Sequence, residues 1–366
     1  MPRNRALDGI RGLAILLVMF FHCGLLDAGW MGVNLFFVLS GYLITKVLLP
    51  WTERDLGFYL KRFWWRRSLR IFPLYYTFIG LVVVMFIFTA IPSSTLDELP
   101  YLLTYSLNFR GMFTLHRDSE FFNYIWSLCV EEQFYLFWPF VVFFAGRKSL
   151  PRIALAILIL SPILRFGLGE YWAASRDSRL GIGGVMYILP VTQLDGFMIG
   201  AILATVGDKI PVKWIKPWFF GALGLLLLAG GISYWALQER MPNLHWSSLG
   251  FPIASWVNWM YVWIYSLLAL LFGSMVAWGV RIQTGAFARI FSLEAMVFLG
   301  KISYGLYLIH MPVIRIMTEV YPLPDSYAGR VLYFFPFAGI SILLAWISFR
   351  YYERIFLRMK DRRFAN

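Results

Sequence analysis

The sequence predicts an all-α fold, a polytopic membrane bundle of about ten transmembrane helices with both termini in the cytoplasm. Three observations support this prediction. The 366 residues are 60% hydrophobic and only 14% charged, whereas soluble domains are roughly 45–50% apolar and 25% charged. The mean hydropathy is +0.66, and the apolar residues form blocks of about twenty, which is long enough to cross a bilayer as helix. Most lysine and arginine residues fall on one side of the predicted bundle.

Ten segments with few charges are predicted to span the membrane, because each is an apolar block of suitable length. In chain order they are residues 10–26, 30–45, 71–91, 123–145, 153–168, 184–206, 218–237, 255–280, 295–317 and 331–349. Residues 100–109 are also apolar, but ten residues are too few to cross. We expect this short segment to lie in the membrane interface or to re-enter.

The loops between the spans determine the orientation. With the N-terminus inside, the basic clusters within residues 3–5, 46–70, 147–152, 209–216, 281–289 and 350–363 all fall in the cytoplasm. This distribution satisfies the positive-inside rule. The formal net charge of +13 therefore reflects orientation in a membrane, and we expect no nucleic-acid partner.

The chain is predicted to be one membrane domain over residues 1–366, with no fused soluble domain. No Ser/Gly-rich linker, low-complexity tract or internal repeat divides it. Cys23 and Cys129 both lie inside apolar segments, so the sequence has neither a disulfide framework nor a metal-ligand spacing, and no metal is expected. The oligomeric state is left open by the sequence.

Arg11 and His22 are the first candidates for function, because an ionisable group at membrane depth costs roughly 2.5–3.5 kcal/mol on insertion scales. Eleven residues return a helix to nearly the same face, so the two side chains would be about 16 Å apart along one stripe. A cation near the cytoplasmic entrance and a deeper imidazole suit a long substrate with an anionic head, such as acyl-CoA. The alternative is an arginine that extends to the interface and a histidine bonded within the bundle.

A basic and aromatic stretch over residues 58–73 precedes the third span, and it contains Arg67 and Arg70. Three residues apart on a helix, these two arginines share a face. They predict a cytoplasmic clamp for the phosphates of a nucleotide-bearing donor, since guanidinium groups bind phosphate in a bidentate manner. The alternative is an interfacial amphipathic helix that binds anionic membrane lipid.

Glu131 and Glu132 lie in the fourth predicted span, and adjacent helical residues point about 100° apart. One of them should face the bundle interior, where a carboxylate opposite His22 would orient the imidazole. Pairing of either carboxylate with Arg165 or Lys301 is an alternative structural role.

Two further intramembrane groups, Asp195 and His310, complete the set of candidates. His310 lies near the outer end of the ninth span, where it could contact an acceptor or cap the helix. Ser40 and Tyr304 are polar residues that could stabilise an oxyanion if a thioester such as acyl-CoA is the substrate.

Several motifs resemble the integral-membrane acyltransferase 3 family, which includes bacterial O-antigen and exopolysaccharide O-acetyltransferases and macrolide O-acyltransferases. The resemblance covers about residues 5–355. It rests on residues 5–14 with Arg11 eleven residues before His22, on the motifs at residues 32–42, 126–135 and 299–310, and on the Arg67-x-x-Arg70 pair. Three positions depart from the family pattern. Asn34 replaces a frequent Asp, Tyr124 a frequent His, and Gln193 a common Arg.

The resemblance implies a ten-helix enzyme of the bacterial inner membrane that transfers an acyl group, with acetyl favoured over longer chains. The implied donor is cytoplasmic acetyl-CoA or another acyl-CoA, and the implied acceptor is a hydroxyl of a glycan or lipid-linked sugar. The resemblance implies that His22 is the general base and that Glu131 is the catalytic carboxylate. It also implies that Arg11, Arg67 and Arg70 bind the donor. A transporter or flippase of a glycan or small molecule is the rival function, but the sequence has no paired interrupted helices to favour it.

Overall fold

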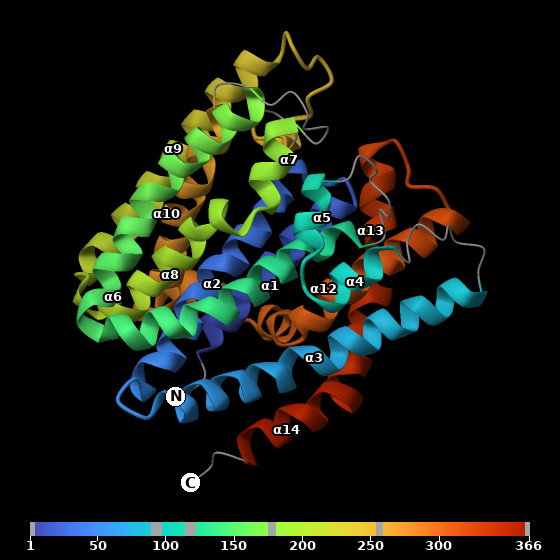
Figure 1. Ribbon diagram of the computed structural model, residues 1–366. Helices are drawn as coiled ribbons and strands as arrows, with labels where there is room; N and C mark the ends of the chain where they lie inside the picture. The colour runs from blue at the N-terminus through green and yellow to red at the C-terminus, as the bar shows by residue number, and fades with distance from the viewer. Residues whose placement is uncertain (1–3, 89–96, 114–121, 175–180, 254–258, 363–366) are drawn as a thin grey trace.

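The computed structural model describes residues 4–88, 97–113, 122–174, 181–253 and 259–362. These residues form helices and no strand, which confirms the all-α prediction (Figure 1). The helices are α1 (Arg5–His22), α2 (Met31–Leu48), α3 (Leu56–Phe88), α4 (Leu99–Leu103), α5 (Leu107–Phe113), α6 (Trp126–Ala174), α7 (Gly181–Ile188), α8 (Leu194–Val206), α9 (Val212–Leu237), α10 (Met260–Arg281), α11 (Gly285–Phe291), α12 (Glu294–Val320), α13 (Tyr327–Ile347) and α14 (Arg354–Arg362).

Seven helical segments in the described residues are long and apolar enough to cross a membrane, so the chain is a multi-pass membrane protein. The predicted number of about ten stays a prediction. The segment that contains α6 covers two of the predicted spans, and its helical geometry is interrupted at Gly146, where φ is 61°. One of the other two predicted spans corresponds to α1, which includes the charged residues Arg5, Asp8 and Arg11. The other, residues 184–206, is divided in the structure into the end of α7, a short 3-10 turn and α8, which has only 13 residues.

The basic stretch and the third span form one continuous helix, α3, of 33 residues with Pro73 inside it. This helix carries Arg67 and Arg70 on the same rigid element as the membrane-crossing segment. The apolar stretch at residues 100–109 becomes α4 and the start of α5, helices of 5 and 7 residues that are too short to cross a bilayer. The C-terminal helix α14 packs along α3 (Figure 1).

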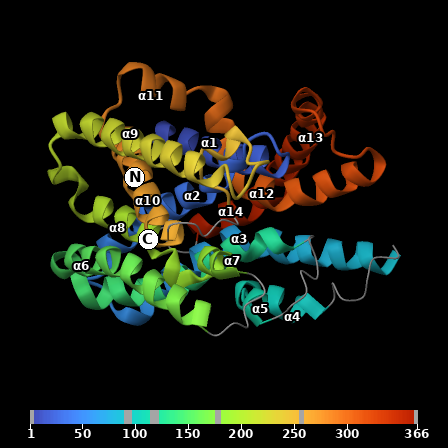
Figure 2. The same ribbon diagram turned by 90° about the horizontal axis from the view of Figure 1, so that it is seen from above.

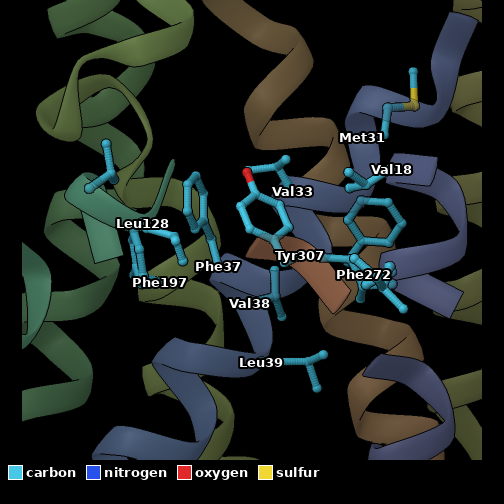
Figure 3. Close-up of a cluster of buried hydrophobic side chains, with 14 of the residues drawn as sticks. Val18, Met31, Val33, Phe37, Val38, Leu39, Leu128, Phe197, Phe272 and Tyr307 are labelled. Carbon is cyan, nitrogen blue, oxygen red and sulfur yellow. The ribbon is translucent and has the colours of Figure 1, made fainter. Parts of the chain in front are cut away.

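The helices that position the candidate site approach each other closely at glycines. A Cβ atom on Gly300 of α12 would lie 1.8 Å from the carbonyl oxygen of Asp8 in α1, and one on Gly41 of α2 would lie 2.1 Å from that of Phe197 in α8. Small residues allow such backbone contact between membrane helices, where packing drives association. In Figure 3 the ring of Phe37 faces that of Phe197, and the two stack with centroids 4.8 Å apart.

The helices divide into an inner set and an outer set that differ in burial. The apolar windows of α2, α10 and α12 are mostly buried, whereas only 22% to 28% of those of α6, α9 and α13 are buried. The exposed side chains include Phe137, Leu228 and Leu332. Both Figure 1 and Figure 2 show α1 and α2 inside, with α6, α9 and α13 around them. The outer apolar surface suits contact with lipid chains.

Candidate active site

The three arginines assigned to donor binding line one pocket together with Glu131. Arg11 comes from α1, Arg67 and Arg70 from α3, and Glu131 from α6. Residues of α2 and α12 line the same pocket as these groups. The rest of the pocket wall consists of Val33, Phe36, Phe37, Leu39, Ser40, Ile71, Ser127, Leu128, Glu132, Tyr135, Ser303, Tyr304 and Tyr307.

Arg67 is held by an aromatic ring and keeps a donor available. Its guanidinium carbon lies 4.0 Å from the centroid of the Tyr135 ring, a cation–π contact. Its Nε atom is buried and, among the residues described, has no hydrogen-bond partner. A buried donor without a partner is costly, and an anionic ligand would satisfy it. The side chain is therefore well placed to bind a phosphate.

Glu131 is fixed in the pocket by a short hydrogen-bond chain. Ser40 Oγ donates to Glu131 Oε1 at 2.6 Å, and Tyr135 Oη donates to Ser40 Oγ at 2.9 Å. Both Glu131 and Glu132 line the pocket, rather than one facing the interior and the other a neighbouring helix. The pocket therefore holds two carboxylates beside three guanidinium groups, a mixed electrostatic environment.

His22 lies outside the lining of this pocket, at the end of α1. Its Nδ1 atom is 3.0 Å from the carbonyl oxygen of Val18 and 3.2 Å from His310 Nε2. The hydrogen bonds of His22 and Glu131 within the described chain go to different partners, so the predicted pairing of His22 with this carboxylate is not observed. His310, which was predicted to contact an acceptor or to cap its helix, lies fully buried inside α12.

Tyr307 connects the pocket to the histidine pair. Its side chain lines the pocket, and its hydroxyl donates to the carbonyl oxygen of Tyr124 at 2.8 Å. Its own carbonyl oxygen lies 2.6 Å from His310 Nδ1, within the same helix. Figure 3 shows the Tyr307 ring beside α2 in the buried core. One turn of α12 therefore contributes to both the arginine pocket and the histidine pair.

Arg165 has a structural partner, so it does not pair with Glu131. Its guanidinium makes two hydrogen bonds to the Asp195 carboxylate, at 2.6 and 3.0 Å, and others to the carbonyl oxygens of Thr192 and Val262. The Arg165 side chain is fully buried. Arg165 therefore links α6 to α8 and α10, and its N–H groups are occupied by these partners and do not bind a substrate.

Comparison with known families identifies the family of the chain. The family model described as an acyltransferase domain, acyltransferase 3, matches residues 4–350. The chain belongs to the acyltransferase 3 family. Within this acyltransferase, the matched range includes every candidate site residue described above.

Curated relatives of this acyltransferase include the peptidoglycan O-acetyltransferase OatA of Listeria monocytogenes. It is 28% identical over 372 residues, which cover 95% of this chain and 55% of the relative. The O-acetyltransferase OatA of Staphylococcus aureus is 27% identical over 364 residues, with 95% of this chain and 56% of the relative covered. The chain therefore spans little more than half the length of these relatives. No solved structure matches it.

Two of the three departures from the acyltransferase 3 pattern contact each other. Asn34 Nδ2 donates to Gln193 Oε1 at 3.0 Å, and both side chains are buried. The two residues form a neutral amide pair between α2 and the residue before α8, at positions where the family pattern predicts Asp and Arg. The third departure, Tyr124, donates its hydroxyl hydrogen to the carbonyl oxygen of Leu308 at 2.6 Å and packs against His310. All three residues therefore have a packing role.

Sequence reasoning missed the contact between His22 and His310, as well as the position of Tyr307. The motif at residues 299–310 contained both residues of α12, but one sequence gives no sign of which helix faces α1. For a metal ion, the described residues contain no suitably close group of three or more His, Cys, Asp or Glu side chains. The polar groups that converge are instead suited to an anionic organic substrate.

Proposed function

We propose that this acyltransferase is an O-acyltransferase of the bacterial cytoplasmic membrane. It moves an acyl group, acetyl in the first instance, from cytoplasmic acyl-CoA to a hydroxyl of a glycan or lipid-linked sugar. The main support is the pocket into which Arg11, Arg67 and Arg70 converge, in a chain whose family transfers acyl groups. The Listeria relative is a peptidoglycan O-acetyltransferase, which makes peptidoglycan the first acceptor to test.

In this proposal the arginine pocket binds the phosphates of acyl-CoA. Guanidinium groups suit this role because they stay charged and present paired donors to phosphate oxygens. Glu131, proposed as the catalytic carboxylate together with His22, acts from within this pocket. Its hydrogen bond from Ser40 and the nearby charges of Arg67 and Arg11 place Glu131 beside the arginines that are proposed to bind the donor.

His22 is proposed as the general base. It takes the proton of the acceptor hydroxyl as that oxygen attacks the thioester carbonyl carbon. The new C–O bond forms, the C–S bond breaks, and the departing thiolate receives the proton from His22, which restores the base. A positioned general base contributes roughly 10²–10⁴-fold to the rate.

The test is acyl transfer by the purified protein in lipid nanodiscs, supplied with radiolabelled acetyl-CoA and glycan acceptors that include lipid-linked peptidoglycan precursor. We expect labelled acetyl esters on the glycan and release of one CoA per ester formed, measured by scintillation counting and mass spectrometry. Movement of a glycan across vesicle membranes without consumption of acetyl-CoA would instead support a transporter and contradict the proposal.

A further inference from the structure

His22 and His310 lie 288 positions apart in sequence, yet their ring centroids are 5.0 Å apart. The close packing of α1 against α12, at Gly300 and Asp8, brings them together. The surroundings of the pair are mostly aromatic. Phe21 contacts the ring of His22, and Tyr124 and Tyr307 contact that of His310. His310 is fully buried, so each of its ring nitrogens needs a partner within the protein.

The partners of the two rings determine where the protons lie. His310 Nδ1 is 2.6 Å from the carbonyl oxygen of Tyr307, and a carbonyl only accepts, so His310 Nδ1 carries the proton. The Nε2 atom of neutral His310 is then an acceptor, and it lies 3.2 Å from His22 Nδ1. His22 Nδ1 also faces the Val18 carbonyl oxygen at 3.0 Å, so this nitrogen is the donor to both.

This proton arrangement leaves the second nitrogen of His22, Nε2, without a proton. An imidazole protonated at Nδ1 has its lone pair on Nε2, and that nitrogen is the one able to act as a base. The Val18 carbonyl is also an acceptor in the ladder of α1. His310 Nε2, in contrast, has no role in a backbone ladder and is directed at His22.

We propose that His310 is a positioning residue for His22. Its Nε2 lone pair accepts the His22 Nδ1 proton, fixes the orientation of the ring, and stabilises the imidazolium formed when His22 Nε2 takes the acceptor hydroxyl proton. This inference rests on the proposed role of His22 as general base. The bonds and protons balance as in the acyl transfer described above. His310 keeps its own Nδ1 proton throughout, and only the Nε2 proton of His22 is gained and lost.

The test compares two substitutions at position 310. H310F keeps the ring volume but has no acceptor, whereas H310Q places an amide oxygen near the position of the imidazole Nε2. We expect H310F to lower kcat by roughly tenfold or more, with KM for acetyl-CoA unchanged because the arginine pocket is intact. H310Q should recover most of the lost kcat. The same change at an exposed histidine, H245F, is the matched control and should leave kcat unchanged.

A spectroscopic measurement tests the pair without reference to activity. The chain has four histidines, so ¹⁵N-histidine labelling and single substitutions assign the signals. We expect a ¹⁵N–¹⁵N correlation between His22 Nδ1 and His310 Nε2 in the wild type, lost in H310F. Absence of this correlation in the folded wild type would overturn the inference.

The kinetic outcomes separate this inference from the proposed function. If H22A is inactive while H310F has wild-type kcat, the role of His310 is wrong and the proposed function stands. Equal loss of kcat in H310F and H310Q would also overturn the role of His310, since a restored acceptor must then be without effect. If H22A transfers acetyl groups at the wild-type rate, the general base itself is wrong.

Discussion

Arg67 shares two features with Arg62 of the same helix α3, an aromatic ring beneath the guanidinium group and a buried Nε atom, but of these two arginines only Arg67 lines the pocket. It lies over the Tyr135 ring, and its buried Nε atom has no hydrogen-bond partner within the described part of the chain. The first feature fixes the guanidinium group, and the second leaves it able to bind an anion. Arg66 is adjacent in sequence but does not line the pocket, which makes it a matched control.

R67A should weaken the binding of acyl-CoA by roughly tenfold or more, because a hydrogen bond to a charged group contributes about 1.5–3 kcal/mol. R66A should change the dissociation constant little. Both constants can be measured by isothermal titration calorimetry with the protein in nanodiscs. Equal weakening by the two substitutions would indicate a general effect of surface charge and contradict a specific donor pocket.

H22A should separate binding from chemistry. His22 does not line the arginine pocket, so the affinity for acetyl-CoA should stay close to that of the wild type. Acetyl transfer should fall by roughly 10²–10⁴-fold, the contribution of a positioned general base. H245A, at an exposed histidine, serves as the control for transfer assays. A large loss of donor affinity in H22A would mean that His22 belongs to the binding site.

At the scale of helix pairs, the Asn34–Gln193 hydrogen bond joins α2 to α8. N34D or Q193R alone places an unpaired charge in a buried site and should lower the free energy of unfolding by at least about 2 kcal/mol. The double variant N34D/Q193R places opposite charges at the two hydrogen-bonded positions and should recover much of this loss. Thermal unfolding in detergent measures all three. Losses that simply add in the double variant would refute the pairing.

The contact of α1 with α12 depends on the absence of a side chain at Gly300. G300A places a Cβ atom against the backbone of Asp8, so the helices must separate, at a cost of about 1–3 kcal/mol. G221A on α9 is the control, because its added Cβ has no neighbour within 4 Å. We therefore expect G300A to unfold at a lower temperature than G221A. Because the same two helices carry His22 and His310, G300A should also reduce acyl transfer.

At the scale of the whole molecule, the orientation in the membrane determines which side supplies the donor. The distribution of basic residues predicts that the start of α9 is cytoplasmic and its end is outside. Both native cysteines are buried, so single introduced cysteines can be labelled against a low background.

With a membrane-impermeant maleimide on intact cells, R240C should be labelled, whereas K213C should be labelled only after the membrane is permeabilised. The positions flank α9 and therefore report on opposite sides of one helix. Labelling of K213C in intact cells would reverse the predicted orientation. The donor pocket would then face away from cytoplasmic acyl-CoA.

Much of the fold was predictable because a bilayer imposes strong local rules. Apolar length, low charge and the side of each basic cluster are properties of the sequence itself, and they predicted an all-helical membrane protein. The spans around Gly146 and the short α8 were less predictable, since helix continuity and helix length depend on neighbouring helices. The grouping of Arg11, Arg67 and Arg70 was expected from the motifs, and the structure places all three in one pocket.

The sequence alone predicts that the chain crosses membranes as helices, shows which charged groups fall inside apolar segments, and carries the motifs that resemble the family. Which of these groups contact one another depends on how the helices pack. Glu131 is bonded to Ser40, His22 is paired with His310, and Arg165 is matched by Asp195. The physical reason is that contacts between distant helices depend on close backbone approach at glycines and on the rotation of each helix, which no local pattern specifies.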